Sequence, residues 1–179
     1  MGADYEAIAH QHRRYYGEGE RHLRIYRRLY ADRTHFVYEL IQNADDTGSK
    51  NLMLILRERD LLVWNDGRRF NEPDASGRFK DDVRDICSIG LSEKELTQIG
   101  TFGIGFKAVY AYTDTPEIYS GHESFRIRRL VEPEAIESPP AQIAQWVAAG
   151  KTVFRLPFKQ GLRSEEIDQL SLRLSSLDK

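Results

Sequence analysis

Residues 51–64 read NLMLILRERDLLVW, and this stretch constrains the fold more than any other part of the sequence. Two apolar runs flank a short polar segment, which predicts two antiparallel strands joined by a tight turn. Further strands are predicted at PEIYS (116–120), SFRIRRLV (124–131) and KTVFRLPF (151–158). Hairpin strands mixed with helices are typical of an α+β fold, here a two-layer α/β sandwich whose mostly antiparallel mixed sheet is covered on one face by helices.

The chain of 179 residues is expected to form a single domain, because it is long enough to bury roughly 70% of its unfolded surface. We divide residues 1–179 into an N-terminal helical region (1–33), a core (34–159) and a C-terminal helical tail (160–179). Helices are also predicted at DDVRDICSIG and AQIAQWVAA and directly after GTFGIG.

Composition narrows the classes of function. A net charge of −2 gives no overall attraction to nucleic acid or to acidic membranes. The single Cys87 has no intramolecular disulfide partner, which fits a reducing compartment, and no apolar run reaches the ~20 residues of a membrane span. We expect a cytoplasmic protein with no membrane partner. The five histidines do not repeat a zinc spacing and are expected to be surface or cap residues: His10, His12, His22, His35 and His122.

The segment ELIQNADD (39–46) places three polar side chains on one stripe of a helix. Glu39, Asn43 and Asp46 follow the i, i+4, i+7 spacing, while the neighbouring apolar flank faces a core. Two acids on a partly buried stripe repel each other, and neither has a cation at helical spacing. A metal ion or polar ligand from outside the helix is therefore the expected source of compensation.

The segment IGTFGIGFKAVY (99–110) carries three glycines where a helix is predicted to begin. Gly100, Gly103 and Gly105 leave main-chain N–H groups uncovered, which together with the helix dipole makes an anion cradle. The segment is not a Walker loop, because no G-K-[ST] follows, and it lacks the βαβ context of a dinucleotide fingerprint. A third signal is VWNDGRRF (63–70), a strand that runs into an Asn-Asp-Gly turn.

The three motifs in this order resemble the GHKL or Bergerat-fold ATP-binding domain of DNA gyrase, the ninety-kilodalton heat-shock chaperones, histidine kinases and mismatch-repair ATPases. Within that group, ELIQNADD, CSIGLSEKELTQIGTFGIGFKAVY and KTVFRLPF most resemble the chaperone-like domain of sacsin and its bacterial relatives. The resemblance covers roughly residues 34–159. It implies the cofactors ATP and Mg2+.

The resemblance assigns roles to the helical stripe. Asn43 matches the Mg2+ ligand, and a hard cation that keeps several waters needs only such sparse protein ligation. Glu39 matches the general base that activates the water attacking the γ-phosphate, and Asp46 an acid that helps to fix the adenine side or bound waters.

The adenine site departs from the usual D-x-G-x-G pattern of the family. Asn65 stands where the family has its first Asp, and Arg69 stands at the second Gly. Asn keeps an acceptor oxygen, so adenine remains a ligand, but the hydrogen bond loses its charge assistance. A shift of one residue would instead make Asp66 the adenine ligand, with Gly67 letting a flat ring approach the backbone. Thr152 matches a family Thr that bonds adenine, or is an ordinary strand residue.

The glycine segment is expected to hold the phosphates. Gly103 and Gly105 match the wrapping glycines, and Lys107 either contacts phosphate or is a solvated helix lysine. Residues 92–98 would form the lid. The remaining members of this segment supply main-chain donors or lid packing: Gly100, Thr101, Phe102, Ile104 and Phe106.

We therefore expect the ATPase module of a larger protein, which binds ATP and ADP and hydrolyses ATP slowly by itself. The resemblance implies that hydrolysis in most family members takes place in an ATP-closed homodimer and uses a phosphate-contacting Lys or Arg from a further domain. One alternative is a nucleotide-gated chaperone-like or nucleic-acid-processing binding module with vestigial hydrolysis. A histidine kinase is disfavoured because Glu39 would direct ATP to water, and nucleic-acid binding through the arginine-rich first helices would be strongly salt-dependent.

Overall fold

A computed structural model describes residues 2–16, 33–74, 76–89 and 105–177, and the structural statements below concern these ranges. No helix within them has the length and apolar character needed to cross a bilayer. The helices are α1 (Tyr5–Tyr16), α3 (Phe36–Asp46), α4 (Asp82–Cys87), the 3-10 helix η1 (Gly105–Ala111), α5 (Ala141–Ala148) and α6 (Ser164–Ser175). The strands are β1 (Leu52–Leu56), β2 (Asp60–Asn65), β3 (Glu117–Ser120), β4 (Glu123–Arg128), β5 (Glu132–Ala135) and β6 (Thr152–Pro157).

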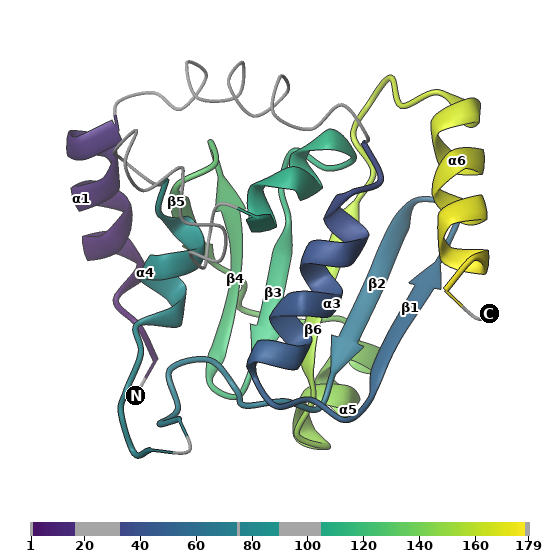
Figure 1. The fold of residues 1–179 in the computed structure, drawn as a ribbon. Helices are drawn as coiled ribbons and strands as arrows, with labels where there is room; N and C mark the ends of the chain where they lie inside the picture. The colour runs from purple at the N-terminus through teal and green to yellow at the C-terminus, as the bar shows by residue number, and fades with distance from the viewer. Residues whose placement is uncertain (1, 17–32, 75, 90–104, 178–179) are drawn as a thin grey trace, which may run out of the picture.

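The six strands form one open sheet in the order β1-β2-β6-β3-β4-β5 (Figure 1). Every strand pair among the described residues is antiparallel, so the α+β class is confirmed and the expected mixed sheet is wrong. The predicted β1–β2 hairpin is confirmed. The last strand, β6, lies between β2 and β3. The C-terminal end of β2, the N-terminal end of β6 and the C-terminal end of β3 therefore lie next to one another, at the same end of these three strands.

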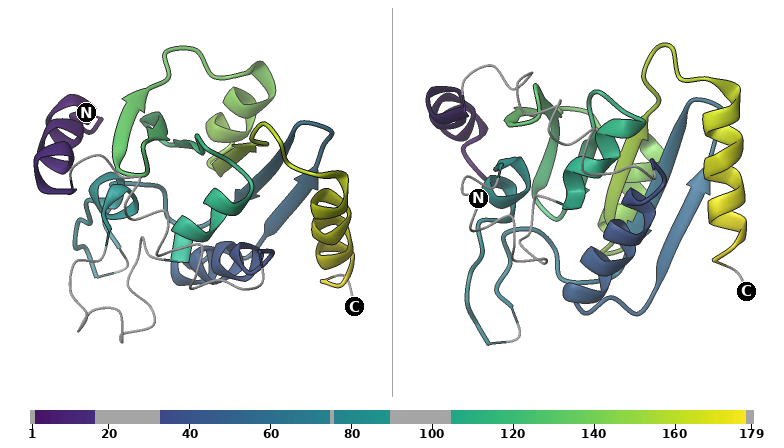
Figure 2. Two further views of the ribbon diagram at one scale, coloured as in Figure 1. Left: turned by 90° about the horizontal axis from the view of Figure 1, so that it is seen from above. Right: turned by 45° about the horizontal axis from the view of Figure 1, so that its top comes forward.

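Helices cover both faces of the sheet, unlike the one-face cover expected from the sequence. Seen from above, α3 and η1 lie on one side of the sheet and α5 on the other (Figure 2). The reason is that β2 is apolar on both sides: Leu61 and Val63 join the main core, whereas Leu62 packs with Ile143 of α5. The short helix α5 fills a second, smaller cluster that strict alternation of polar and apolar residues would not predict.

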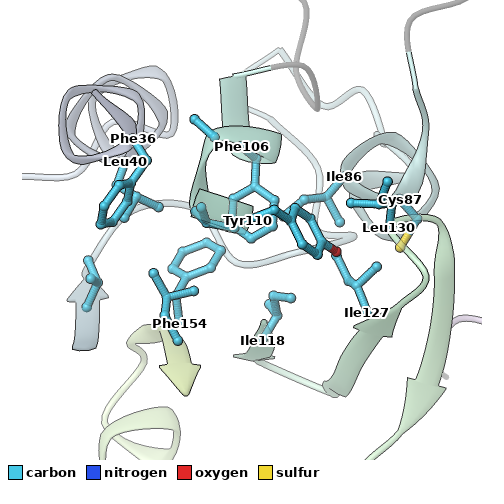
Figure 3. Close-up of a cluster of buried hydrophobic side chains, with 14 of the residues drawn as sticks. Phe36, Leu40, Ile86, Cys87, Phe106, Tyr110, Ile118, Ile127, Leu130 and Phe154 are labelled. Atoms are coloured by element: carbon cyan, nitrogen blue, oxygen red, sulfur yellow. The ribbon is translucent and has the colours of Figure 1, made fainter. Parts of the chain in front are cut away.

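The main core lies between α3, η1 and the sheet (Figure 3). Phe106 of η1 is 1% exposed, and its ring centroid lies 5.7 Å from that of Phe154 on β6. Phe36 and Leu40 of α3 are buried on the same side of the sheet. The Phe106 side chain therefore anchors η1 to the sheet instead of packing in a lid, whereas the alternative role of Phe106 as a main-chain donor stays a prediction.

Helix α3 has the amphipathic character that the sequence predicts. Phe36, Val37, Leu40 and Ala44 are buried. The helix ends where Gly48 adopts a φ of 74°, a left-handed conformation that glycine accepts without strain. The polar stripe is thereby held on the flank of α3 that is not packed into the core.

Two features near the outer strand β5 differ from the sequence prediction. The strand β5 was not predicted, because its sequence EPEA lacks strand-forming residues; ion pairs from Arg126 and Arg128 of β4 to Glu134 accompany the pairing. His12 of α1 is buried and its Nδ1 lies 2.9 Å from the Val131 carbonyl oxygen, so the surface role expected for it is wrong. The division into residues 1–33, 34–159 and 160–179 stays a prediction.

Candidate functional site

The polar stripe of α3 is accessible along its length. The Glu39 side chain is 22% exposed, Asn43 is half-buried and Asp46 is exposed. The apolar residues that interleave with them hold the helix against the sheet. The three side chains are therefore available to groups that approach α3 from outside the core.

A histidine accompanies Glu39, contrary to the expectation that neither acid has a cation at helical spacing. His35 Nε2 lies 3.2 Å from Glu39 Oε1, and the two residues are one helical turn apart. Histidine gains a charge only when it is protonated, which is why a count of Lys and Arg misses it. The i, i+4 spacing in the sequence was the signal that could have identified this pair.

The glycine segment meets α3 at Glu39. A Cβ atom built on Gly105 would lie 1.8 Å from Glu39 Oε2 and 2.6 Å from its Cδ, so a residue other than glycine would displace this carboxylate. The start of η1 and the acid of the helical stripe, far apart in the sequence, are thus in direct contact. Gly100, Thr101, Phe102, Gly103, Ile104 and the lid residues 92–98 lie outside the described residues.

The Asn-Asp-Gly turn meets the other end of the same helix. A Cβ atom on Gly67 would lie 2.1 Å from Thr47 Oγ1, and the Arg68 main-chain N–H donates to the Thr47 carbonyl oxygen over 2.9 Å. Thr47 is the residue at which α3 ends. Glycine at position 67 is therefore required by close packing, and the turn is fixed relative to α3.

Three buried polar side chains form a row across the sheet beside this turn, which we call the polar row: Asn65, Thr152 and Ser120. The strand register places Thr152 of β6 opposite Asn65 of β2 and opposite Ser120 of β3. Asn65 Oδ1 accepts from the Gly67 N–H at 3.1 Å, and Ser120 Oγ lies 2.5 Å from Thr152 Oγ1. Ser120 was missed by the sequence analysis, because only the long-range insertion of β6 makes it a neighbour of Thr152.

Asp66 points away from the polar row and is fully engaged elsewhere. Its carboxylate accepts hydrogen bonds from Ser49 Oγ, from the main-chain N–H groups of Lys50 and Asn51, and from Asn51 Nδ2, at 2.7–2.9 Å. Lys151 Nζ lies 3.7 Å from it. The hydrogen bonds from Asn51 are the main cause that holds the pKa of Asp66 below its ordinary value. Of the two residues that the sequence left open, Asn65 is the one that lies in the polar row, and the choice of adenine ligand stays a prediction.

A family model described as the Sacsin domain matches residues 21–142, which is more than half of the chain. The chain belongs to the Sacsin domain family. This confirms the sacsin-type resemblance seen in the sequence, while the wider GHKL assignment stays a prediction.

Two curated proteins are similar in sequence to this chain. Protein NO VEIN of Arabidopsis thaliana is 31% identical over 154 residues, an alignment that covers 73% of this chain and 5% of that protein. Sacsin of Homo sapiens is 30% identical over 132 residues, covering 63% of this chain and 3% of that protein. The chain thus spans only a small part of the length of either relative.

Lys107 takes neither of the two roles that the sequence left open for it. The side chain is 1% exposed, and Nζ donates to the carbonyl oxygens of Ile86 (2.7 Å) and Leu130 (2.6 Å). Burial lowers the pKa of Lys107 to about 8. In this Sacsin domain the lysine ties η1 to α4 and to the turn between β4 and β5, so it is neither a solvated lysine nor a phosphate ligand.

A buried ion pair supports the turn that follows Gly67. Arg68 donates to both carboxylate oxygens of Asp82, at 2.6 and 2.7 Å, and also to the Glu72 carbonyl oxygen. The Arg68 and Asp82 side chains are 14% and 3% exposed. Arg69, at the position of the family's second Gly, instead forms a solvent-exposed pair with Glu72. Sequence reasoning missed the Arg68–Asp82 pair, because nothing local links the two residues.

Proposed function

We propose that this Sacsin domain binds Mg-ATP along α3 and hydrolyses it slowly. The observation that carries the proposal is that α3 meets both turn-forming motifs: Gly105 at Glu39, and Gly67 at Thr47. Two motifs that are separate in the sequence thereby border the helix that carries the third. The order and spacing of these motifs are those of the ATP-binding domains that the sequence resembles.

One part of the proposed site, which we call the base end, consists of Asn65, Gly67 and Thr152. Asn65 offers an amide and Thr152 a hydroxyl, the two kinds of group that pair with the edge of a purine base. Gly67 has no side chain to obstruct a flat ring. This proposal uses Asn65 as the ligand of the adenine amine and Thr152 as a second polar contact, made directly or through a water molecule.

The other part, which we call the phosphate end, consists of Glu39, Asn43 and Gly105. The Gly105 backbone leaves room that a Cβ would fill, and Asn43 offers an amide oxygen on the accessible stripe, so the residues fit a Mg-bound phosphate chain. When bound, Mg2+ would neutralise phosphate charge beside the acids of α3. Glu39 would orient and deprotonate the attacking water, with His35 holding the carboxylate in place.

Slow turnover is part of the proposal because the chain corresponds to a small fraction of each relative. Related ATP-binding domains, as described for the GHKL group, receive a phosphate-contacting cation from a further domain and close as dimers. We expect the same contribution from other parts of a longer protein, or from a second copy of this chain.

Phosphate release from Mg-ATP tests the chemistry directly. Glu39→Gln should lower turnover by at least about 100-fold while ATP affinity changes by less than about threefold, because the carboxylate acts on water rather than on the base. The matched control is Glu58→Gln, an exposed glutamate in the β1–β2 turn, which should leave both unchanged. Equal turnover in the unaltered chain, Glu39→Gln and Glu58→Gln, with ATP still bound, would contradict the proposed hydrolysis and leave a nucleotide-binding module. Absence of ATP binding would remove the whole proposal.

A further inference from the structure

The polar row continues past the two residues assigned to the base, and its third member has no role in the proposed function. Asn65, Thr152 and Ser120 are 5%, 2% and 0% exposed. Ser120 receives a hydrogen bond from the main-chain N–H of Phe70 at 3.0 Å, in addition to its contact with Thr152. A hydroxyl buried this deeply and held from two sides has a restricted set of hydrogen-bond directions.

The Phe70 N–H makes the polarity of the pair of hydroxyls depend on the ligand. This N–H occupies one acceptor site of Ser120 Oγ, and within the described part of the chain Thr152 Oγ1 is the acceptor within hydrogen-bond distance of the Ser120 hydrogen. In the chain alone either polarity leaves one hydroxyl hydrogen without an acceptor among the described residues. A ligand atom that accepts from Thr152 allows Ser120 to donate to Thr152, so both hydrogens are paired. A ligand atom that donates to Thr152 leaves the buried Ser120 hydrogen unpaired, which is unfavourable.

This dependence on the ligand adds to the discrimination by Asn65. Its Oδ1, which accepts from the Gly67 N–H, can also accept from the adenine amine, whereas an amide rotated to donate to the guanine carbonyl loses the hydrogen bond from Gly67. The neighbouring N1 atom of the ring is an acceptor in adenine and carries a hydrogen in guanine. A hydroxyl that is constrained to donate pairs with the first and not with the second.

We propose that Ser120 is the positioning residue that makes this site selective for adenine over guanine nucleotides, because it fixes the Thr152 hydroxyl as a donor toward the base. The proposal rests on the proposed function, since it concerns the base end of the same site. It assigns to the Ser120–Thr152 pair part of the discrimination that the first Asp of D-x-G-x-G is expected to supply in the GHKL domains that the sequence resembles.

Calorimetric titrations with Mg-ATP and Mg-GTP on the unaltered chain, Ser120→Ala and Ser124→Ala test this inference. The unaltered chain should prefer ATP by at least about tenfold, and Ser120→Ala should reduce that preference by at least about fivefold, because the freed Thr152 hydroxyl can then accept as well as donate. Ser124→Ala is the matched control, because the Ser124 hydroxyl on β4 has no hydrogen-bond partner among the described residues. Its preference should equal that of the unaltered chain.

If the role of Ser120 is purely structural, Ser120→Ala should weaken the binding of ATP and GTP equally. That result, or an unaltered preference for ATP, overturns the inference. Thr152→Val provides a second route if Ser120→Ala does not fold: it removes the directed hydroxyl and should also reduce the preference, whereas an unchanged ratio contradicts the inference. A chain that binds ATP and GTP equally overturns the inference alone. A chain that binds neither overturns the proposed function with it.

Discussion

The two ends of the proposed site differ in how firmly the fold holds their side chains. The base end consists of Asn65, Gly67 and Thr152, and the phosphate end of Glu39, Asn43 and Gly105. Asn65 and Thr152 are at most 5% exposed and are held by neighbours on β3 and in the following turn. Glu39 keeps 22% of its side chain exposed, and its histidine partner keeps 43%. The fold therefore holds Asn65 and Thr152, which are proposed to bind the base, in place. Glu39, which is proposed to act at the phosphates, remains accessible to water and ligand.

This difference implies that substitutions at the two ends should have different consequences. Changes beneath the base end should lower the free energy of unfolding, because they disturb buried, mutually bonded groups. Changes at the phosphate end should affect turnover with little loss of stability.

The largest expected effect on stability is that of Arg68→Ala, beneath the base end. Removing the guanidinium leaves the buried Asp82 carboxylate without its partner, and we expect a loss of about 3 kcal/mol. Arg69→Ala is the matched control: its pair with Glu72 is exposed, so the loss should stay below about 1 kcal/mol. Urea denaturation of both variants measures the difference. Equal losses would show that the Arg68–Asp82 pair does not support this end.

At the phosphate end, Gly105→Ala should lower turnover by about 100-fold, equivalent to about 2.7 kcal/mol, because the new methyl group displaces the Glu39 carboxylate. The carboxylate lies at the end of a flexible side chain, so stability should fall by no more than about 1 kcal/mol. Phosphate release and urea denaturation on the same samples separate the two quantities. Normal turnover in Gly105→Ala would show that Glu39 does not take part in the reaction. As a control, adding Gly105→Ala to Glu39→Gln should cause no further loss of turnover.

The smallest expected effect on stability is that of Asp66→Asn, in the turn that follows Asn65. Hydrogen bonds from Asn51 and Ser49 hold the pKa of Asp66 below its ordinary value of 3.8. Folded Asp66 therefore binds its proton less readily than unfolded Asp66, so its contribution to stability is present above pH 3.8 and is lost as the pH falls below this value. The stability gap between the unaltered chain and Asp66→Asn should shrink between about pH 5 and about pH 2. A gap that stays constant in urea denaturation would show that these hydrogen bonds do not favour the carboxylate.

Local patterns in the sequence predicted the elements whose partners are nearby. The α3 stripe follows from helical periodicity, and the β1–β2 hairpin from two apolar runs around a turn. Periodicity does not predict which residues from distant parts of the sequence pack against an element. Ser120 becomes part of the polar row only because β6 inserts between β2 and β3, and Lys107 is buried only because the Ile86 and Leu130 carbonyl oxygens converge on it. The second layer formed by α5 is a long-range feature of the same kind.

Calorimetric titration of this chain with ATP, with Mg2+ present and then chelated, tests the central claim most directly. We predict one ATP per chain with Mg2+, and an affinity at least about tenfold weaker without it, since the acids of α3 then face unneutralised phosphate. No heat of binding at millimolar ATP, or an affinity indifferent to Mg2+, would contradict the claim that α3 forms one wall of a Mg-ATP site.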